Sequence, residues 1–263
     1  MNKAIAFFVS ISILFTSCEK EIEIELNTAD QKLVIEGAIT NEAGPYKVTL
    51  TRTVGFSDPN DYPGVTNATV VISTDTGDRD TLTHSSNGTY WTNTTVGVPG
   101  VTYLLDVYVD GNHYWSQSRM PELVPLEGIE FIPFEGPGNG DSYSVLPNFI
   151  DPPQFGNNYR FIQTINNTVD NSYVIYNDNV NNGLENQRPV FSPTSEIISG
   201  DVVELEMRCV DLNTYNYYFT LSQMAFNGPG GGTTPSNPPS VFSEDVLGVF
   251  SAYTIQRAAG TAP

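Results

Sequence analysis

The stretch Val107-Tyr108-Val109-Asp110-Gly111-Asn112-His113-Tyr114-Trp115 predicts a tight β-hairpin and is the strongest structural signal in the chain. Asp110-Gly111 suits a two-residue turn, which needs positive φ angles. Around it, short period-two segments alternate with turn residues from Lys32 to Met120. The expected strands are Lys32–Ile39, Tyr46–Thr53, Ala68–Thr74, Asp80–His84, Thr89–Thr94, Thr102–Asp110 and His113–Met120. Seven short strands at this spacing predict an immunoglobulin-like β-sandwich over residues 32–121.

The second half, residues 122–263, keeps the strand chemistry. Its expected strands are Gly128–Phe134, Tyr159–Asn166, Ser172–Tyr176, Asp201–Val210 and Gly248–Gln256. Alternation within Asp201–Val210 places Cys209 on the buried face as an inert core thiol, in preference to a reactive one. Apolar residues at helical spacing then predict one helix near residues 213–227, capped by Asp211 or Asn213. The fold class is therefore mainly β: an N-terminal immunoglobulin-like β-sandwich followed by a second β-rich domain with one covering α-helix.

Residues 1–17 resemble a lipoprotein signal peptide. Lys3 supplies a positive charge, and the apolar run Ala4–Phe15 is shorter than the roughly 20 residues that span a bilayer. Phe15-Thr16-Ser17-Cys18 then resembles a lipobox, with Phe15 where most lipoboxes have Leu. We expect cleavage before Cys18 and attachment of more than one acyl chain to it, since stable anchoring requires this. The alternative is an ordinary secretory signal with a chance cysteine.

Residues 18–31 form an acidic segment that we interpret as a tether at the membrane face. Lys20, Glu21 and Glu23 directly follow the lipidated cysteine and resemble the signal that exports Bacteroidetes lipoproteins to the outer face of the outer membrane. The alternative is a solvated spacer. We therefore expect a lipid-anchored outer-membrane protein that is exposed at the cell surface.

The charge balance restricts the partners of the mature chain. Removing residues 1–17 leaves 10 basic and 30 acidic residues, a net charge of about −20. This charge repels phosphate backbones and anionic lipids, so it disfavours nucleic-acid binding and binding to membranes through a basic patch. The expected ligand is neutral or cationic. Lipidation of Cys18 leaves Cys209 without a disulfide partner.

No catalytic or cofactor motif is recognisable. His84 and His113 lie near predicted turns and are interpreted as surface residues, and no nucleophile elbow, zinc motif or phosphate loop is present. The oxygen-rich segments Asp58–Asp61 and Asn177–Glu185 suggest calcium, but neither has the spacing of a twelve-residue calcium loop. Solvated loops are the favoured interpretation, so no metal, no cofactor and no enzymatic activity are predicted.

Three surface features remain as candidate contacts. Trp91 and Trp115 could stack on sugars from neighbouring strands, although a Trp in a sandwich is more commonly a core residue, and we favour the core. Asp80-Thr81-Leu82 resembles a Bacteroidetes O-glycosylation site, with Thr81 as the acceptor. The loop Gly228–Pro239 is the expected contact surface, because loops on a rigid scaffold carry recognition.

The order and spacing of several segments resemble a family of Bacteroidetes outer-membrane lipoproteins catalogued as domain of unknown function 4249. The matching residues are Leu33–Asn41, Gly44-Pro45, Val48–Arg52, Val65–Ile72, Gly100–Leu105, Ser118–Pro121, Asp151-Pro152, Asn158–Arg160, Tyr217–Phe219, Pro235–Pro239 and Leu247–Tyr253. The resemblance covers nearly the whole mature chain. It implies an outer-membrane lipoprotein often encoded beside a TonB-dependent transporter, and it implies no known activity or catalytic residue.

These observations favour an accessory binding lipoprotein that captures or presents a nutrient for a TonB-dependent outer-membrane transporter. One alternative is an envelope hydrolase of glycans or peptides, whose carboxylates would come from different strands. Another is a structural or adhesive lipoprotein.

Overall fold

The computed structural model describes residues 30–55, 58–134, 142–180, 182–192, 194–226, 237–244 and 246–263. The predicted signal peptide, Cys18 and the export residues Lys20, Glu21 and Glu23 lie outside this part of the chain. Within it, no helix is both long and apolar enough to cross a membrane.

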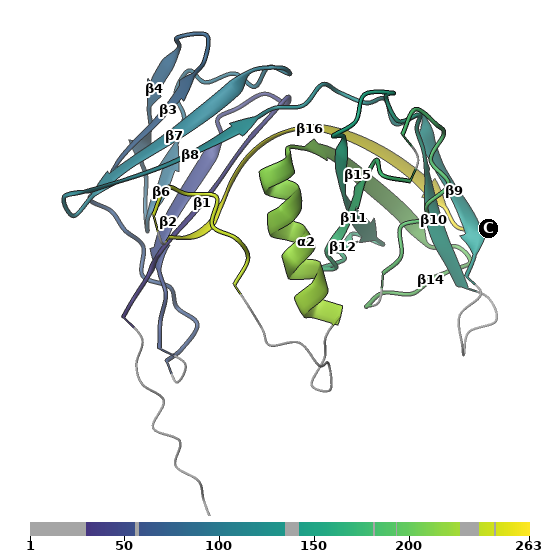
Figure 1. The fold of residues 1–263 in the computed structure, drawn as a ribbon. Helices are drawn as coiled ribbons and strands as arrows, with labels where there is room; N and C mark the ends of the chain where they lie inside the picture. The colour runs from purple at the N-terminus through teal and green to yellow at the C-terminus, as the bar shows by residue number, and fades with distance from the viewer. Residues whose placement is uncertain are drawn as a thin grey trace, which may run out of the picture.

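The N-terminal half is a two-layer β-sandwich, as predicted (Figure 1). Its first layer contains β1 (Leu33–Thr40), β2 (Lys47–Arg52), β5 (Thr83–His84) and β6 (Thr89–Trp91). Its second layer contains β3 (Thr69–Thr74), β4 (Arg79–Thr81), β7 (Thr102–Val109) and β8 (Asn112–Arg119). Inward residues of both layers, such as Ile35, Val48, Ile72 and Leu105, form one buried core. Burial of this apolar surface holds the two layers together.

The hairpin between β7 and β8 has the predicted geometry. Asp110 and Gly111 have φ angles of 52° and 80°, as a two-residue turn of this kind requires. The segment expected as one strand, Asp80–His84, is instead two short strands in different layers. The chain bends at Leu82, whose buried side chain faces the core, so β4 and β5 pair with different partners.

The last strand, β16 (Leu247–Thr261), joins the two halves of the molecule. Residues 247–253 pair in parallel with β1, and residues 254–261 pair antiparallel with β15 (Val202–Val210). Gly248 has a φ of 101°, and a Cβ at this position would lie 2.1 Å from the carbonyl oxygen of Ile35. Only glycine therefore allows β16 to enter the ladder here. The predicted division of the chain after residue 121 stays a prediction.

The C-terminal half continues this sheet and adds a second, smaller one. Strand β15 pairs with β11 (Asn158–Ile165), and β11 pairs with β12 (Thr168–Val169) and β13 (Val174–Asn177). The smaller sheet contains β9 (Gly128–Pro133), β10 (Ser142–Asn148) and β14 (Ile197–Ile198). A second core, which includes Val145, Phe161 and Leu205, fills the space between the two sheets.

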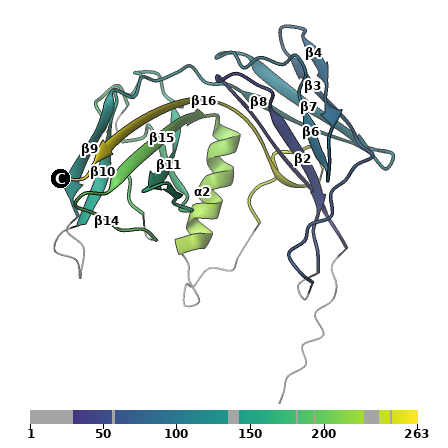
Figure 2. The same cartoon turned by 180° about the vertical axis from the view of Figure 1, so that it is seen from behind.

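Helix α2 (Leu212–Phe226) covers the opposite face of the large sheet, as expected. Asp211 caps it, because its Oδ1 accepts a 2.8 Å hydrogen bond from the N–H of Thr214. Both views show an arch, with β16 along the top and α2 inside (Figures 1 and 2). The start of β1, the C-terminal end of α2 and β14 lie toward its open side.

Candidate functional site

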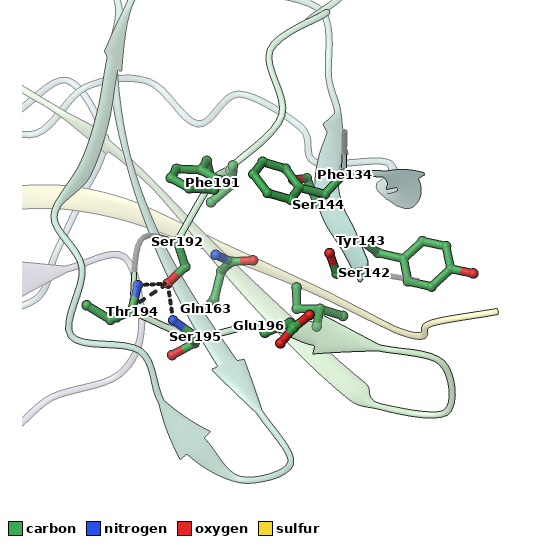
Figure 3. Close-up of a pocket in the computed structure, with 12 residues that line it drawn as sticks. Phe134, Ser142, Tyr143, Ser144, Gln163, Phe191, Ser192, Thr194, Ser195 and Glu196 are labelled. Atoms are coloured by element: carbon green, nitrogen blue, oxygen red, sulfur yellow. Dashed lines mark hydrogen bonds between the residues drawn. The ribbon is translucent and has the colours of Figure 1, made fainter. Parts of the chain in front are cut away.

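A pocket of about 260 Å³ lies beside the second core, between the smaller sheet and strand β11 (Figure 3). Ser142 and Ser144 come from β10, and Gln163 comes from β11. Phe134 and Phe191 lie on another side of the pocket, together with Ser192. The pocket is therefore built from segments that are far apart in the sequence.

Two buried side chains in this pocket each have one polar atom without a hydrogen-bond partner among the described residues. Gln163 is 3% exposed and Ser142 is 5% exposed, and neither Gln163 Oε1 nor Ser142 Oγ has a partner. On β11, Gln163 continues the inward face of Tyr159 and Phe161, where the pattern places core residues. A buried polar group without a partner costs about 1–3 kcal/mol. These two groups could therefore bind a hydrogen-bonding ligand.

The aromatic side of the pocket offers an apolar surface. The rings of Phe134 and Phe191 stack with centroids 5.1 Å apart and an angle of 23° between their planes. Phe191 is 40% exposed, so part of its side chain remains available to a ligand. A ring surface beside hydrogen-bonding groups suits a ligand with one apolar and one polar face.

A buried carboxylate fixes the loop that carries Phe191. Ser192 Oγ and Thr194 Oγ1 both donate to Asp170, and the N–H of Ser172 donates to it over 2.7 Å. Burial raises the pKa of Asp170, but the hydrogen bonds from Ser172, Ser192 and Ser195 outweigh this effect and lower the pKa overall. The carboxylate therefore stays ionised and holds the loop in place.

The Ser192 hydroxyl stabilises its own loop through hydrogen bonds and is not placed as a nucleophile. Its oxygen accepts hydrogen bonds from the N–H groups of Thr194 and Ser195 over 3.1 and 2.9 Å. Among the described residues, no histidine lines the pocket to act as its base. The geometry therefore supports binding rather than acyl transfer.

A larger apolar groove adjoins this pocket. It has a volume of about 520 Å³, lies between β13 and α2, and shares Phe191 and Thr194 with the pocket. Tyr173 and Phe219 supply much of its aromatic surface. A ligand longer than the pocket could therefore extend past Phe191 into this groove.

The core interpretation of the two tryptophans was wrong. Trp91 on β6 is 37% exposed and Trp115 on β8 is 45% exposed, because Tyr90 and Ser116 take the inward positions beside them. They belong to different sheets, so they do not lie on neighbouring strands and form no joint platform. Each remains only a separate surface aromatic residue.

The structure also locates Thr81, Cys209 and the two histidines. Thr81 is exposed on β4, but Asp80 beside it is buried and accepts hydrogen bonds from the N–H groups of residues 93–95. Cys209 is a free, buried thiol whose pKa is raised by burial, as expected for an inert core residue. Both histidines are exposed, and His113 Nε2 lies 2.7 Å from Asp106 Oδ1.

The described residues contain no cluster of three or more His, Cys, Asp or Glu side chains that could hold a metal. In the two oxygen-rich segments, Asp58 accepts a hydrogen bond from the N–H of Gly55, and Asp178 accepts from those of Gly156 and Asn157. These carboxylates therefore stabilise turns. Residues 228–236 of the predicted contact loop lie outside the described part of the chain.

Sequence reasoning missed the pocket residues Gln163 and Ser142. The available signal was a polar residue at an inward position of a predicted strand, as in Tyr159-Arg160-Phe161-Ile162-Gln163. Because β10 itself was not predicted, the burial of Ser142 could not be recognised.

Comparison with known proteins adds one positive finding. No curated protein matches the sequence. The family model described as a domain of unknown function, DUF4249, matches residues 19–258 of the 263. The chain therefore belongs to the DUF4249 family.

Proposed function

We propose that this protein is a surface-anchored accessory lipoprotein that binds a small neutral, hydroxyl-rich ligand, such as a saccharide, for a TonB-dependent outer-membrane transporter. The observation that carries the binding role is the pair of buried polar groups without partners, Gln163 Oε1 and Ser142 Oγ, in the pocket between the two sheets. Such groups recover their hydrogen bonds when a ligand supplies them.

The chemistry of the pocket supports the ligand class. The amide oxygen of Gln163 requires a donor, whereas the hydroxyls of Ser142 and Ser144 can donate or accept. Phe191 supplies an aromatic surface against which the C–H face of a sugar can pack. Glu196 is exposed at the pocket, and the chain has a net charge of −19, so an anionic ligand is disfavoured.

The position of the described N-terminus supports the membrane role. Strand β1 begins at the open side of the arch, where α2 ends and β14 lies (Figures 1 and 2). A lipid on Cys18 would be separated from Asp30 by 12 residue steps, and a chain of that length reaches at most about 40 Å. An anchor at Cys18 would therefore keep the open side near the bilayer and near a membrane transporter.

Ligand binding is tested with purified mature chain carrying Cys18→Ser. Isothermal titration with a panel of neutral mono- and disaccharides should find a ligand whose affinity falls at least tenfold in Gln163→Leu. The matched control is Gln117→Leu, which changes an exposed glutamine on β8 and should bind normally. The binding role would be rejected if no saccharide binds, or if Gln163→Leu binds as well as the wild type.

The anchor and the transporter require separate tests. Mass spectrometry of the native protein should find acyl chains on Cys18, and Cys18→Ser should release the protein from the membrane fraction. Tagged protein at native expression, extracted in mild detergent, should co-purify with a TonB-dependent transporter. Repeated recovery of the protein alone would contradict the accessory role, and an unacylated first residue would contradict the anchor.

A further inference from the structure

Two arginines lie directly opposite each other under helix α2. Arg160 on β11 pairs with Arg208 on β15, and their side chains occupy the face of the sheet opposite the Gln163 pocket. Two adjacent cations repel each other, and burial strengthens this repulsion. The pair is therefore unfavourable unless negative charge compensates both side chains.

A carboxylate compensates the charge of Arg208, but none of the described carboxylates pairs with Arg160. Arg208 forms a 2.5 Å ion pair with Glu206, and Glu206 also pairs with Arg257. No described carboxylate forms an ion pair with Arg160. The guanidinium of Arg160 lies 3.6 Å from the ring centroid of Tyr218, and its Nε is buried without a hydrogen-bond partner.

Arg160 and Arg208 both line a small pocket. It has a volume of about 50 Å³, several times the roughly 10–15 Å³ that holds one water molecule. Thr214 and Ser251 line it with hydroxyl groups, and the Thr214 hydroxyl lies 2.9 Å from that of Ser251. Tyr218 and Tyr253 supply aromatic walls, and no described Asp or Glu lines the pocket.

The charge environment of Arg160 agrees with this geometry. Burial lowers the pKa of Arg160 most strongly, Tyr218 beside it raises the pKa, and the charge of Arg208 lowers it further. An anion between the two arginines would offset the effects of burial and of Arg208. Guanidinium groups bind carboxylates through two parallel hydrogen bonds.

We propose that Arg160, Arg208, Thr214 and Ser251 form a binding site for one small carboxylate group, independent of the saccharide pocket. The site lies where α2 packs on the sheet, so an occupied site stabilises the contact between this helix and β11. The overall negative charge weakens long-range attraction of anions, so we expect binding in the millimolar range for an isolated carboxylate.

The test measures the melting temperature of the mature chain carrying Cys18→Ser in sodium formate, acetate, sulfate and chloride at equal ionic strength. Formate and acetate should raise the melting temperature with saturation, since ligands that bind only the folded state stabilise it. Chloride should give only the common effect of ionic strength, and sulfate should give a rise without saturation, because it is excluded from protein surfaces. Arg160→Met should abolish the carboxylate-specific rise.

The matched control is Arg52→Met, which removes an equal charge from a partly exposed ion pair with Asp110 and should keep the rise. Arg160→Lys keeps the charge but not the two-point geometry, so it should weaken the response at least threefold even if the methionine variant does not fold. A rise in formate and acetate that does not saturate would overturn the proposal. An unchanged carboxylate response in either Arg160 variant would overturn it as well.

Discussion

Ser118 Oγ donates a 2.6 Å hydrogen bond to Asp211 Oδ2, although the two residues are 93 positions apart in the sequence. The same oxygen accepts a 2.8 Å hydrogen bond from the N–H of Ala252 on β16. Asp211 in turn caps α2 through Thr214. One buried hydroxyl thus connects strand β8 of the sandwich, the helix cap and the strand shared by both halves.

Ser118→Ala should lower the free energy of unfolding by about 2–3 kcal/mol. The substitution leaves the buried N–H of Ala252 and one oxygen of Asp211 without the hydroxyl that bonds both of them. Urea denaturation followed by circular dichroism measures the loss. Ser86→Ala removes an exposed hydroxyl and should change stability by less than about 0.5 kcal/mol. Equal effects of the two substitutions would show that the connection contributes nothing to stability.

Asp80 should make the sandwich sensitive to acid. Burial raises its pKa, but hydrogen bonds from Thr94, Thr95 and Asn93 outweigh this effect and lower the pKa to about 2. A carboxyl whose pKa is lower in the folded state stabilises the fold above its ordinary pKa of 3.8 and loses this contribution as the pH falls toward 2.

The stability difference between wild type and Asp80→Asn should be about 2 kcal/mol at pH 7 and should shrink steadily between pH 4 and about pH 2. Urea denaturation at a series of pH values measures it. Asp61→Asn changes an exposed aspartate and should change stability by less than about 0.5 kcal/mol. A difference for Asp80→Asn that does not depend on pH would contradict the role of the carboxylate charge.

Most of the strands, the hairpin turn and the helix could be predicted from the sequence, because turn residues and the spacing of apolar residues specify local structure. Asp110-Gly111 produced the turn with two positive φ angles, and the alternation ending at Cys209 placed Val203, Leu205 and Met207 in the core. Helix α2 likewise followed from its apolar spacing and its cap at Asp211.

Pairing between distant strands could not be predicted in this way. The parallel ladder between β1 and β16 joins residues more than 200 positions apart, and no local pattern specifies such a partner. Trp91 illustrates the same limit within one strand. Adjacent residues of a strand face opposite sides, so only one of Tyr90 and Trp91 could be in the core, and the preference for a buried Trp selected the wrong one.

The candidate site escaped prediction because its residues break the patterns that identify strands. Strand β10 carries two buried serines, Ser142 and Ser144, and Pro147 lies within it. A proline within a run argues against a strand assignment. The serines that line the pocket and the proline beside them therefore both hid the strand.

Cys209 should resist thiol reagents in the folded protein. Its side chain is buried and its pKa is raised by burial, so very little thiolate is exposed to a reagent. In mature chain carrying Cys18→Ser, labelling with a chromogenic disulfide should be negligible without denaturant and complete in concentrated urea. An exposed control thiol, introduced by Ser86→Cys, should react at once. Rapid labelling of native Cys209 would contradict its place in the core.

Gln163→Leu should separate a binding role of the pocket from a structural one. If Gln163 stabilised the fold, its replacement would lower the free energy of unfolding, as substitutions in a packed core do. Because its Oε1 is buried without a partner, we expect instead that leucine of similar size raises the free energy of unfolding by about 1 kcal/mol in the absence of ligand. Urea denaturation of the ligand-free proteins measures this change, with Gln117→Leu as the exposed control.

Loss of stability in Gln163→Leu would mean that the amide has hydrogen-bond partners in the folded protein, for example bound water, and that it stabilises the fold. A gain in stability together with weaker saccharide binding would identify Gln163 as a residue that binds ligand but lowers the stability of the ligand-free protein.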